Sequence, residues 1–362
     1  MNIKSLLLGS AAALAAVSGA HAADAIVAAE PEPLEYVRIC DAYGAGYFYI
    51  PGTETCLKIG GMVRTEAYFH DPYVVGQGVK NGTEWHTRAE LNVDTATDTE
   101  YGPLKTNMIY RFNSTEGEND SRVLWATISL GGFIVGKTDS QYNQWIGYAG
   151  NVINDDVIGD GPYELNQLSY LYDSGTGLTG VISVEDSNSG SNSDGTPVTD
   201  LNTGRNESDH YAPDAVAGIG YKAGAVGLKV VGGYDSNVEE GAIKARLDVD
   251  FGTFKAFLMG AWNTDGSKVN RYANGELAGD IPVSTGDYTL WGGTTYEIND
   301  KLEWNTQVAY AQSHMFEATT NLNYFIAKGF KINPEITYVK FDGGGVDSGD
   351  KFSGVLRFQR TF

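Results

Sequence analysis

The chain has 362 residues, of which 42% are hydrophobic, 12% aromatic and 20% charged, with 46 glycines and two cysteines. This composition excludes an intrinsically disordered chain, which is poor in aromatic residues, and a small domain held together by many disulfides. The 46 acidic and 25 basic residues give a formal net charge of −21. Such an acidic chain has no basic surface for DNA or RNA, so we predict no nucleic-acid partner.

Residues 1–22 have the pattern of a secretory signal peptide. Lys4 supplies the positive charge, an apolar run extends to Val17, and Ala20–Ala22 has the small-residue pattern of a cleavage site. A transmembrane helix is the alternative, but it needs about 20 apolar residues, and this run is shorter and interrupted by glycine and serine. Cleavage would remove the basic Lys4 and leave a mature chain with a net charge of −22.

Residues 23–55 are predicted to lead into the first strand from the periplasmic side, and they contain one of the two cysteines. Cys40 and Cys56 are the only cysteines of the chain. In an exported protein an isolated pair is most simply a disulfide, which would contribute about 3 kcal/mol in the chain-entropy model. A metal site is the alternative, but no histidine lies between the two cysteines. We therefore expect a disulfide, and we expect no metal and no other cofactor.

From residue 56 onward, polar and apolar residues alternate, as in strands whose two faces meet different environments. In residues 57–67, 85–95, 241–251 and 351–362, every Asp, Glu, Lys and Arg except Arg360 lies on the polar face. A soluble β-sandwich also alternates, but large aliphatic residues fill its inner face. Here Gly, Ala and Thr thin out the apolar face, which favours contact with lipid, where a Lys or Arg would cost about 2–4 kcal/mol.

Sixteen segments of this kind are predicted as strands. They are residues 56–69, 84–97, 103–113, 121–130, 132–138, 165–173, 177–185, 212–222, 225–235, 240–251, 253–263, 286–298, 301–313, 315–327, 329–341 and 351–362. The connections alternate between short turns and longer polar loops, and an even number of strands places both chain ends on one side. The sequence therefore predicts an all-β fold, a 16-stranded antiparallel transmembrane β-barrel over residues 56–362.

The stretch Glu35–Gly61, with the sequence EYVRICDAYGAGYFYIPGTETCLKIGG, closely resembles the general porins of alphaproteobacteria, of the Brucella and rhizobial type. Glu100–Gly102, Asn166–Tyr170 and the final Phe362 resemble the same family. The resemblance implies a homotrimeric channel for small hydrophilic solutes and ions, set in outer-membrane lipid and lipopolysaccharide. It also implies that Phe362 is a signal for the barrel-assembly machinery; an ordinary interfacial aromatic is the alternative.

The connection 140–164 is predicted to fold into the barrel as a constriction loop. It contains no Lys or Arg, and its acidic residues are Asp155, Asp156, Asp160 and Glu164. Its position between the fifth and sixth strands resembles that of the inserted loop in such porins. The alternative is an acidic loop on the solvated surface.

A basic wall is predicted opposite this loop, on pore-facing positions of the first, second, third and sixteenth strands. Its residues are Lys58, Arg64, Arg88, Arg111 and Arg357. A rise of about 3.3 Å per residue places Lys58 and Arg111 nearer the rims and the other three near mid-height. An acidic loop facing a basic wall produces a transverse field that orients dipolar solutes. The negative net charge predicts a mild preference for cations.

An enzyme and an adhesive or structural barrel are the two alternatives to a channel. His86 lies on a pore-facing position, but no serine is beside it on that strand, and no pattern of a catalytic triad is present. We therefore expect no enzymatic activity. Residues 186–211 contain Asp and Asn side chains that could bind Ca²⁺, without the regular spacing of a dedicated site.

Overall fold

The computed structural model describes residues 37–70, 82–155, 157–189, 211–268, 270–273, 276–278, 281–283, 286–342 and 349–362. The predicted signal peptide, Asp156 and most of residues 186–211 lie outside these ranges. Two compact units divide the chain, Met1–Ile39 and Cys40–Phe362, and every element below belongs to the second. No helix among the described residues is long and apolar enough to span a membrane.

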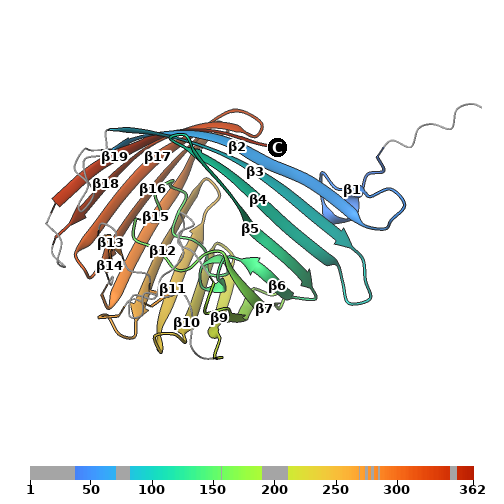
Figure 1. The fold of residues 1–362 in the computed structure, drawn as a ribbon, viewed down its shortest axis with the longest axis horizontal. Helices are drawn as coiled ribbons and strands as arrows, with labels where there is room; N and C mark the ends of the chain where they lie inside the picture. Colours follow the sequence, from blue (N-terminus) through green and yellow to red (C-terminus); the bar gives the residue numbers. More distant parts are fainter. Residues whose placement is uncertain are drawn as a thin grey trace, which may run out of the picture. The chain divides into compact units, whose positions relative to one another are not determined.

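The second unit is a closed barrel of sixteen antiparallel strands (Figure 1). They are β2 (Cys56–His70), β3 (Thr83–Thr97), β4 (Leu104–Thr115), β5 (Glu118–Leu130), β6 (Phe133–Thr138), β7 (Leu165–Asp173), β8 (Leu178–Glu185), β9 (Asp214–Ala223), β10 (Val226–Asp235), β11 (Glu240–Asp250), β12 (Phe254–Asn263), β15 (Tyr288–Asn299), β16 (Leu302–Ala311), β17 (Met315–Ala327), β18 (Phe330–Phe341) and β19 (Gly349–Thr361). Each strand pairs with the next, and β19 pairs with β2 to close the ring. The predicted architecture is confirmed, and each predicted segment coincides with one strand within three residues at either end.

Five short elements were not predicted, because two to four residues are too few for a periodic signal. They are the 3₁₀ helix η1 (Asp41–Tyr43), β1 (Phe48–Tyr49), the single-turn helix α2 (Gln141–Gln144), β13 (Glu276–Ala278) and β14 (Ile281–Val283). The last two form a hairpin inside the connection that was predicted as a plain loop.

The disulfide between Cys40 and Cys56 is confirmed, with the two Cα atoms 6.1 Å apart. It joins η1 to the start of β2, and β1 pairs with the same end of β2. The Tyr43 hydroxyl donates to Asp98 at 2.6 Å, and this hydrogen bond is the main reason that the pKa of Tyr43 is raised to about 12. The segment before the barrel is therefore fastened to the rim at which β2 begins.

Burial is inverted relative to a water-soluble protein. On β17, Glu317 and Asn321 are buried, whereas Leu322 and Tyr324 on the opposite face are exposed. Ile219 and Leu258 are likewise exposed on other strands, at 63% and 60%. Apolar side chains point away from the barrel axis and polar ones point inside, as expected for a barrel with lipid outside and water within.

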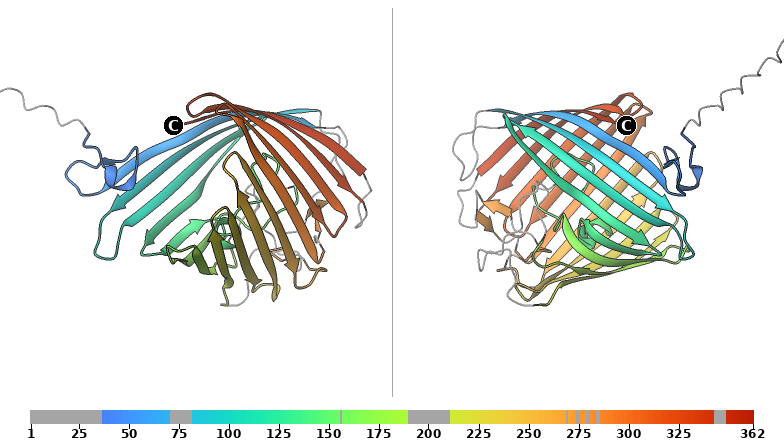
Figure 2. Two further views of the ribbon diagram at one scale, coloured as in Figure 1. Left: turned by 180° about the vertical axis from the view of Figure 1, so that it is seen from behind. Right: turned by 45° about the vertical axis from the view of Figure 1, so that its right-hand side comes forward.

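The apolar core lies inside the barrel, between the wall and the segment that joins β6 to β7. One cluster unites Tyr142 and Ile146 of that segment with inward side chains of β8–β11, and another unites Ala149 and Ile158 with those of β12 and β15–β18. Figure 2 shows this green segment within the barrel from two further directions. A core in this place means that the loop, and not the barrel alone, determines the shape of the interior.

Candidate functional site

The segment Ser140–Glu164 is an inserted loop that crosses the interior of the barrel. It starts with α2, where the hydroxyl of Ser140 caps the helix by accepting from the Tyr142 amide at 3.1 Å. Farther along, the amides of Ile153 and Asn154 donate to the carboxylate of Glu335 on β18, at 2.5 and 2.8 Å. The loop therefore reaches strands that lie far from β6 and β7 around the barrel.

Three basic side chains of β10 and β11 hold the loop by its oxygen atoms. Lys244 is fully buried, and its ammonium donates at 2.6 Å to the side chain of Asn143 and at 2.6 Å to the carbonyl of Asp160. Arg246 donates to the carbonyl of Tyr148 at 2.5 Å, and Lys229 donates to the carbonyl of Trp145. Lys244 therefore meets the loop, whereas Lys229 and Arg246 hold the loop backbone and also line a cavity beside it.

The predicted acidic residues of the loop occupy different environments. Asp160 is 2% exposed, and its carboxylate accepts hydrogen bonds from the Asn143 amide group, the Tyr163 hydroxyl and the Ala149 backbone amide. All three donors belong to the inserted loop, so Asp160 stabilises the conformation of that loop. Glu164 forms ion pairs with basic residues of β5 and β6, at 2.9 Å to Arg122 and 3.1 Å to Lys137. Asp156 lies outside the described residues.

A cavity of about 810 Å³ lies between the loop and strands β2–β5 and β19. It brings together two acidic residues of the loop, Asp155 and Glu164, and four of the five predicted wall residues, namely Arg64, Arg88, Arg111 and Arg357. The fifth, Lys58, is not among the lining residues. Its ammonium lies 5.7 Å from the centre of the Tyr47 ring, near the rim at which β2 begins. We call these four arginines, which lie on β2, β3, β4 and β19, the arginine wall. Because Lys58 is not part of it, the wall does not extend to the rim at which β2 begins.

Glu66 lies at the centre of the arginine wall, and the sequence prediction missed it. It is fully buried, accepts from Arg357 at 2.5 Å, and lies 3.3 Å from Arg64 and 2.8 Å from Nδ1 of His86. Arg64 is paired across the strands with Arg88, so the carboxylate lies beside a cluster of like charges. The alternation of the sequence places Glu66 on the same pore-facing side of its strand as Arg64, and this was a signal of a role in the pore. Its partners could not be predicted, because they depend on the register between strands that are distant in sequence.

The comparisons with known proteins decide the family. A family model described as a porin subfamily matches residues 24–359. The chain is 41% identical over 380 residues to the porin Omp2b of Brucella abortus (strain 2308) and 42% identical over 388 residues to the porin Omp2b of Brucella suis, with all of each chain covered. The chain belongs to the porin family. The resemblance found in the sequence is confirmed, and with the 16-stranded barrel it places this porin in the bacterial outer membrane.

Solved structures share the fold of this porin at low sequence identity. The outer membrane channel DcaP of Acinetobacter baumannii has a TM-score of 0.63 and 15% identity, over 87% of this chain and 99% of that one. The anion-selective porin from Comamonas acidovorans has a TM-score of 0.56 and 13% identity, over 85% and 100% of the two chains. At these identities the likeness concerns the barrel and not its ligands.

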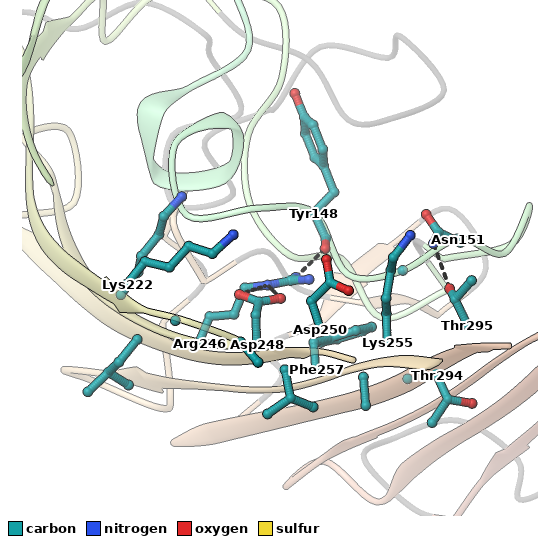
Figure 3. A pocket seen from close by; sticks show the side chains of 18 of the residues that line it. Tyr148, Asn151, Lys222, Arg246, Asp248, Asp250, Lys255, Phe257, Thr294 and Thr295 are labelled. Atoms are coloured by element: carbon teal, nitrogen blue, oxygen red, sulfur yellow. Dashed lines mark hydrogen bonds and ion pairs between the residues drawn. The ribbon is translucent and has the colours of Figure 1, made fainter. Parts of the chain in front are cut away.

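A second cavity of the porin, of about 580 Å³, lies on the other side of the inserted loop (Figure 3). Tyr148 lines both cavities. Two cations of the second cavity have an acidic partner: Arg246 contacts both carboxylate oxygens of Asp248, at 2.9 and 3.0 Å, and Lys255 pairs at 3.0 Å with Glu297, which lies outside the cavity lining. These two pairs reduce the contribution of Arg246 and Lys255 to the electric field in this cavity.

Proposed function

We propose that this porin is a water-filled channel for the passive diffusion of small hydrophilic solutes and ions, with its narrowest part between the inserted loop and the arginine wall. The single observation that carries this proposal is the 810 Å³ cavity, in which residues of the loop and of the wall line the same space. A constriction lined by charges of both signs favours polar solutes and disfavours apolar ones. An apolar solute displaces the water that hydrates these charges and offers no hydrogen bonds in its place.

The two sides of the proposed constriction carry different net charges. Arg64, Arg88, Arg111 and Arg357 supply the positive side. On the loop, Arg122 and Lys137 already neutralise much of Glu164, so Asp155 and the adjacent Asp156 supply the negative side. Asp160 contributes by stiffening the loop. Because the mature chain carries a net charge of −22, cations are concentrated near the pore, and we expect a mild cation preference.

Single-channel recording in planar bilayers under a KCl gradient tests the proposal. We expect discrete ohmic steps and a reversal potential of the cation-selective sign. The double variant Asp155→Asn/Asp156→Asn should move the reversal potential toward anions. Asp300→Asn is the control, because it removes one aspartate charge from an exposed turn between β15 and β16, away from the cavity. An absence of steps would contradict the channel and leave an adhesive or structural barrel, or an enzyme, as the function. A double variant that behaves like the control would contradict the constriction.

We also propose that residues 1–22 are the signal peptide for export and that residues 23–55 lie on the periplasmic side. After export, the protein assembles as a homotrimer in outer-membrane lipid and lipopolysaccharide. The belt of exposed apolar residues supplies a surface for lipid and for neighbouring copies. Phe362 is proposed as the signal for the barrel-assembly machinery; the residue is 64% exposed, while its backbone pairs with Gly61. Light scattering of the purified protein should give three chains per particle. Deletion of Phe362 should lower the amount of folded protein in the outer membrane.

A further inference from the structure

The connection between β12 and β15 sends a tight turn, Asn270–Ala273, into the barrel. The side chain of Asn270 accepts from the amides of Tyr272 and Ala273 at 3.0 and 2.9 Å, and it donates to Asn263 at 2.7 Å. The turn is thereby shaped by its own first residue. Arg271 and Tyr272 are 5% and 1% exposed, so both side chains of the turn's centre are directed into the interior.

Arg271 fixes the turn to three neighbouring parts of the wall. Its guanidinium pairs at 2.9 Å with Asp214, the first residue of β9, which is fully buried. It also donates to the carbonyls of Asp186 and Ser187 at 2.7 and 2.8 Å. Its backbone amide donates to Asp235 at the end of β10 at 2.8 Å. A cation held by this many acceptors ties the turn rigidly to the wall.

Tyr272 connects the turn to the root of the inserted loop. Its hydroxyl donates at 2.9 Å to Glu185, and the same carboxylate accepts from the Ser140 hydroxyl at 2.8 Å and the Gln141 amide at 3.0 Å. Its ring packs 5.2 Å from the ring of Tyr142. The ring lies over Gly233, where a Cβ atom would come within 2.5 Å of it. The barrel wall thus provides a space that the aromatic ring of Tyr272 fills.

We propose that Arg271 and Tyr272 form a strut that fixes the start of the inserted loop. The strut closes the bore on the β8–β11 side at the strand ends next to Glu185, Asp214 and Asp235, which are opposite to the ends that line the second cavity, so that solutes pass only along the arginine wall. Both are positioning residues for selection by size, and the inference rests on the proposed channel function. The strut acts through Glu185, which holds the turn and the loop root at once. Loss of the strut frees the loop root and widens the passage.

Liposome swelling with neutral sugars of increasing size, together with single-channel recording, tests the strut. Tyr272→Ala and Arg271→Ala should raise the entry rate of the largest sugar relative to the smallest severalfold and add rapid current fluctuations. Tyr272→Phe keeps the ring and should give a smaller rise. Gly233→Ala should reproduce Tyr272→Ala from the opposite partner, because its new methyl group displaces the ring. Gly227→Ala, on the same strand, is the control, because its Cβ atom would meet only the Lys222 side chain, at an ordinary contact distance of 3.9 Å.

A second control is Lys268→Ala, which removes a cation of the same connection that pairs with Glu240 near the surface. Wild-type and control proteins without conductance steps would contradict the channel itself. Conducting wild type with unchanged sugar ratios in all four strut variants would overturn the strut alone. If Arg271→Ala fails to fold, as judged by heat-modifiable migration in gels, Tyr272→Phe and Gly233→Ala still decide the question.

Discussion

The two inner walls of the barrel have similar sequence patterns and different roles. On β2–β5 and β19, inward arginines such as Arg64 and Arg111 keep 14% and 12% of their side chains exposed and pair with carboxylates of their own wall. On β10 and β11, the inward Lys244 has no exposed surface and donates to the inserted loop. A period of two predicts which residues face inward. It does not predict whether an inward charge meets water or another segment of the chain.

The difference has an energetic consequence. A cation in a watery bore is hydrated, so its removal changes the electric field and costs little stability. A fully buried cation is held by its acceptors, and its removal leaves those acceptors without a donor. Mutations in the first wall should therefore change selectivity, and mutations in the second should change stability and the position of the loop.

The largest effect is expected for Lys244→Met. The substitution keeps the volume but removes the donor to Asn143 and to the carbonyl of Asp160, and we expect the free energy of unfolding to fall by about 3 kcal/mol. Urea unfolding of the barrel in detergent micelles, followed by tryptophan fluorescence, measures this change. Arg88 on the other wall donates to Asn113 at 2.7 Å, and the variant Arg88→Met should lower the free energy of unfolding by about 1 kcal/mol. Equal losses for the two variants would erase the distinction between the walls.

The second-largest effect is expected for one of two buried carboxylates, which lie on different walls. Glu66→Gln removes the negative charge between Arg357 and Arg64, so the reversal potential should move clearly toward anions. Glu335→Gln removes an equally buried carboxylate that binds loop amides on the other wall. It should alter loop stability and move the reversal potential much less. The idea fails if the two variants shift the potential by the same amount under one KCl gradient.

Features that depend on residues close together in the sequence could be predicted, and contacts between distant residues could not. The strands, their faces and the Cys40–Cys56 disulfide could be predicted, because alternation against lipid and water repeats every two residues and the cysteines are close in sequence. The charge partners could not. Glu66 and Arg357 are separated by 291 positions and meet only when β19 closes on β2.

The inserted loop shows the same limit. Its location and acidic character could be predicted, but the commitment of Asp160 to the loop's own hydrogen bonds could not. Tyr272 and its space over Gly233 lie in different elements, and nothing in either segment alone indicates the contact. Contacts between segments inside the bore are therefore the part of the structure that sequence periodicity leaves open.

A moderate effect is expected for Arg64→Gln/Arg88→Gln. These residues face each other across β2 and β3, and the loss of two positive charges from the cavity should increase the preference for cations. The shift should be largest in dilute KCl and shrink near 1 M, where the Debye length is about 3 Å. Lys301→Gln, a change in the exposed turn between β15 and β16 and outside both cavities, is the control. A shift that is independent of salt would show that the substitution acts by moving the loop and not by changing the field.

The smallest effect is expected for Lys58→Gln. Lys58 has the same strand and face as Arg64, but it was predicted nearer the rim and is not among the residues that line the 810 Å³ cavity. Its loss removes a cation near the Tyr47 ring, worth about 0.5–1 kcal/mol, and should leave the reversal potential unchanged within error. A shift as large as that of Arg64→Gln alone would mean that the field controlling ion passage extends to the rim. The selectivity of the pore would then depend on the whole height of the arginine-bearing wall and not on its contact with the inserted loop.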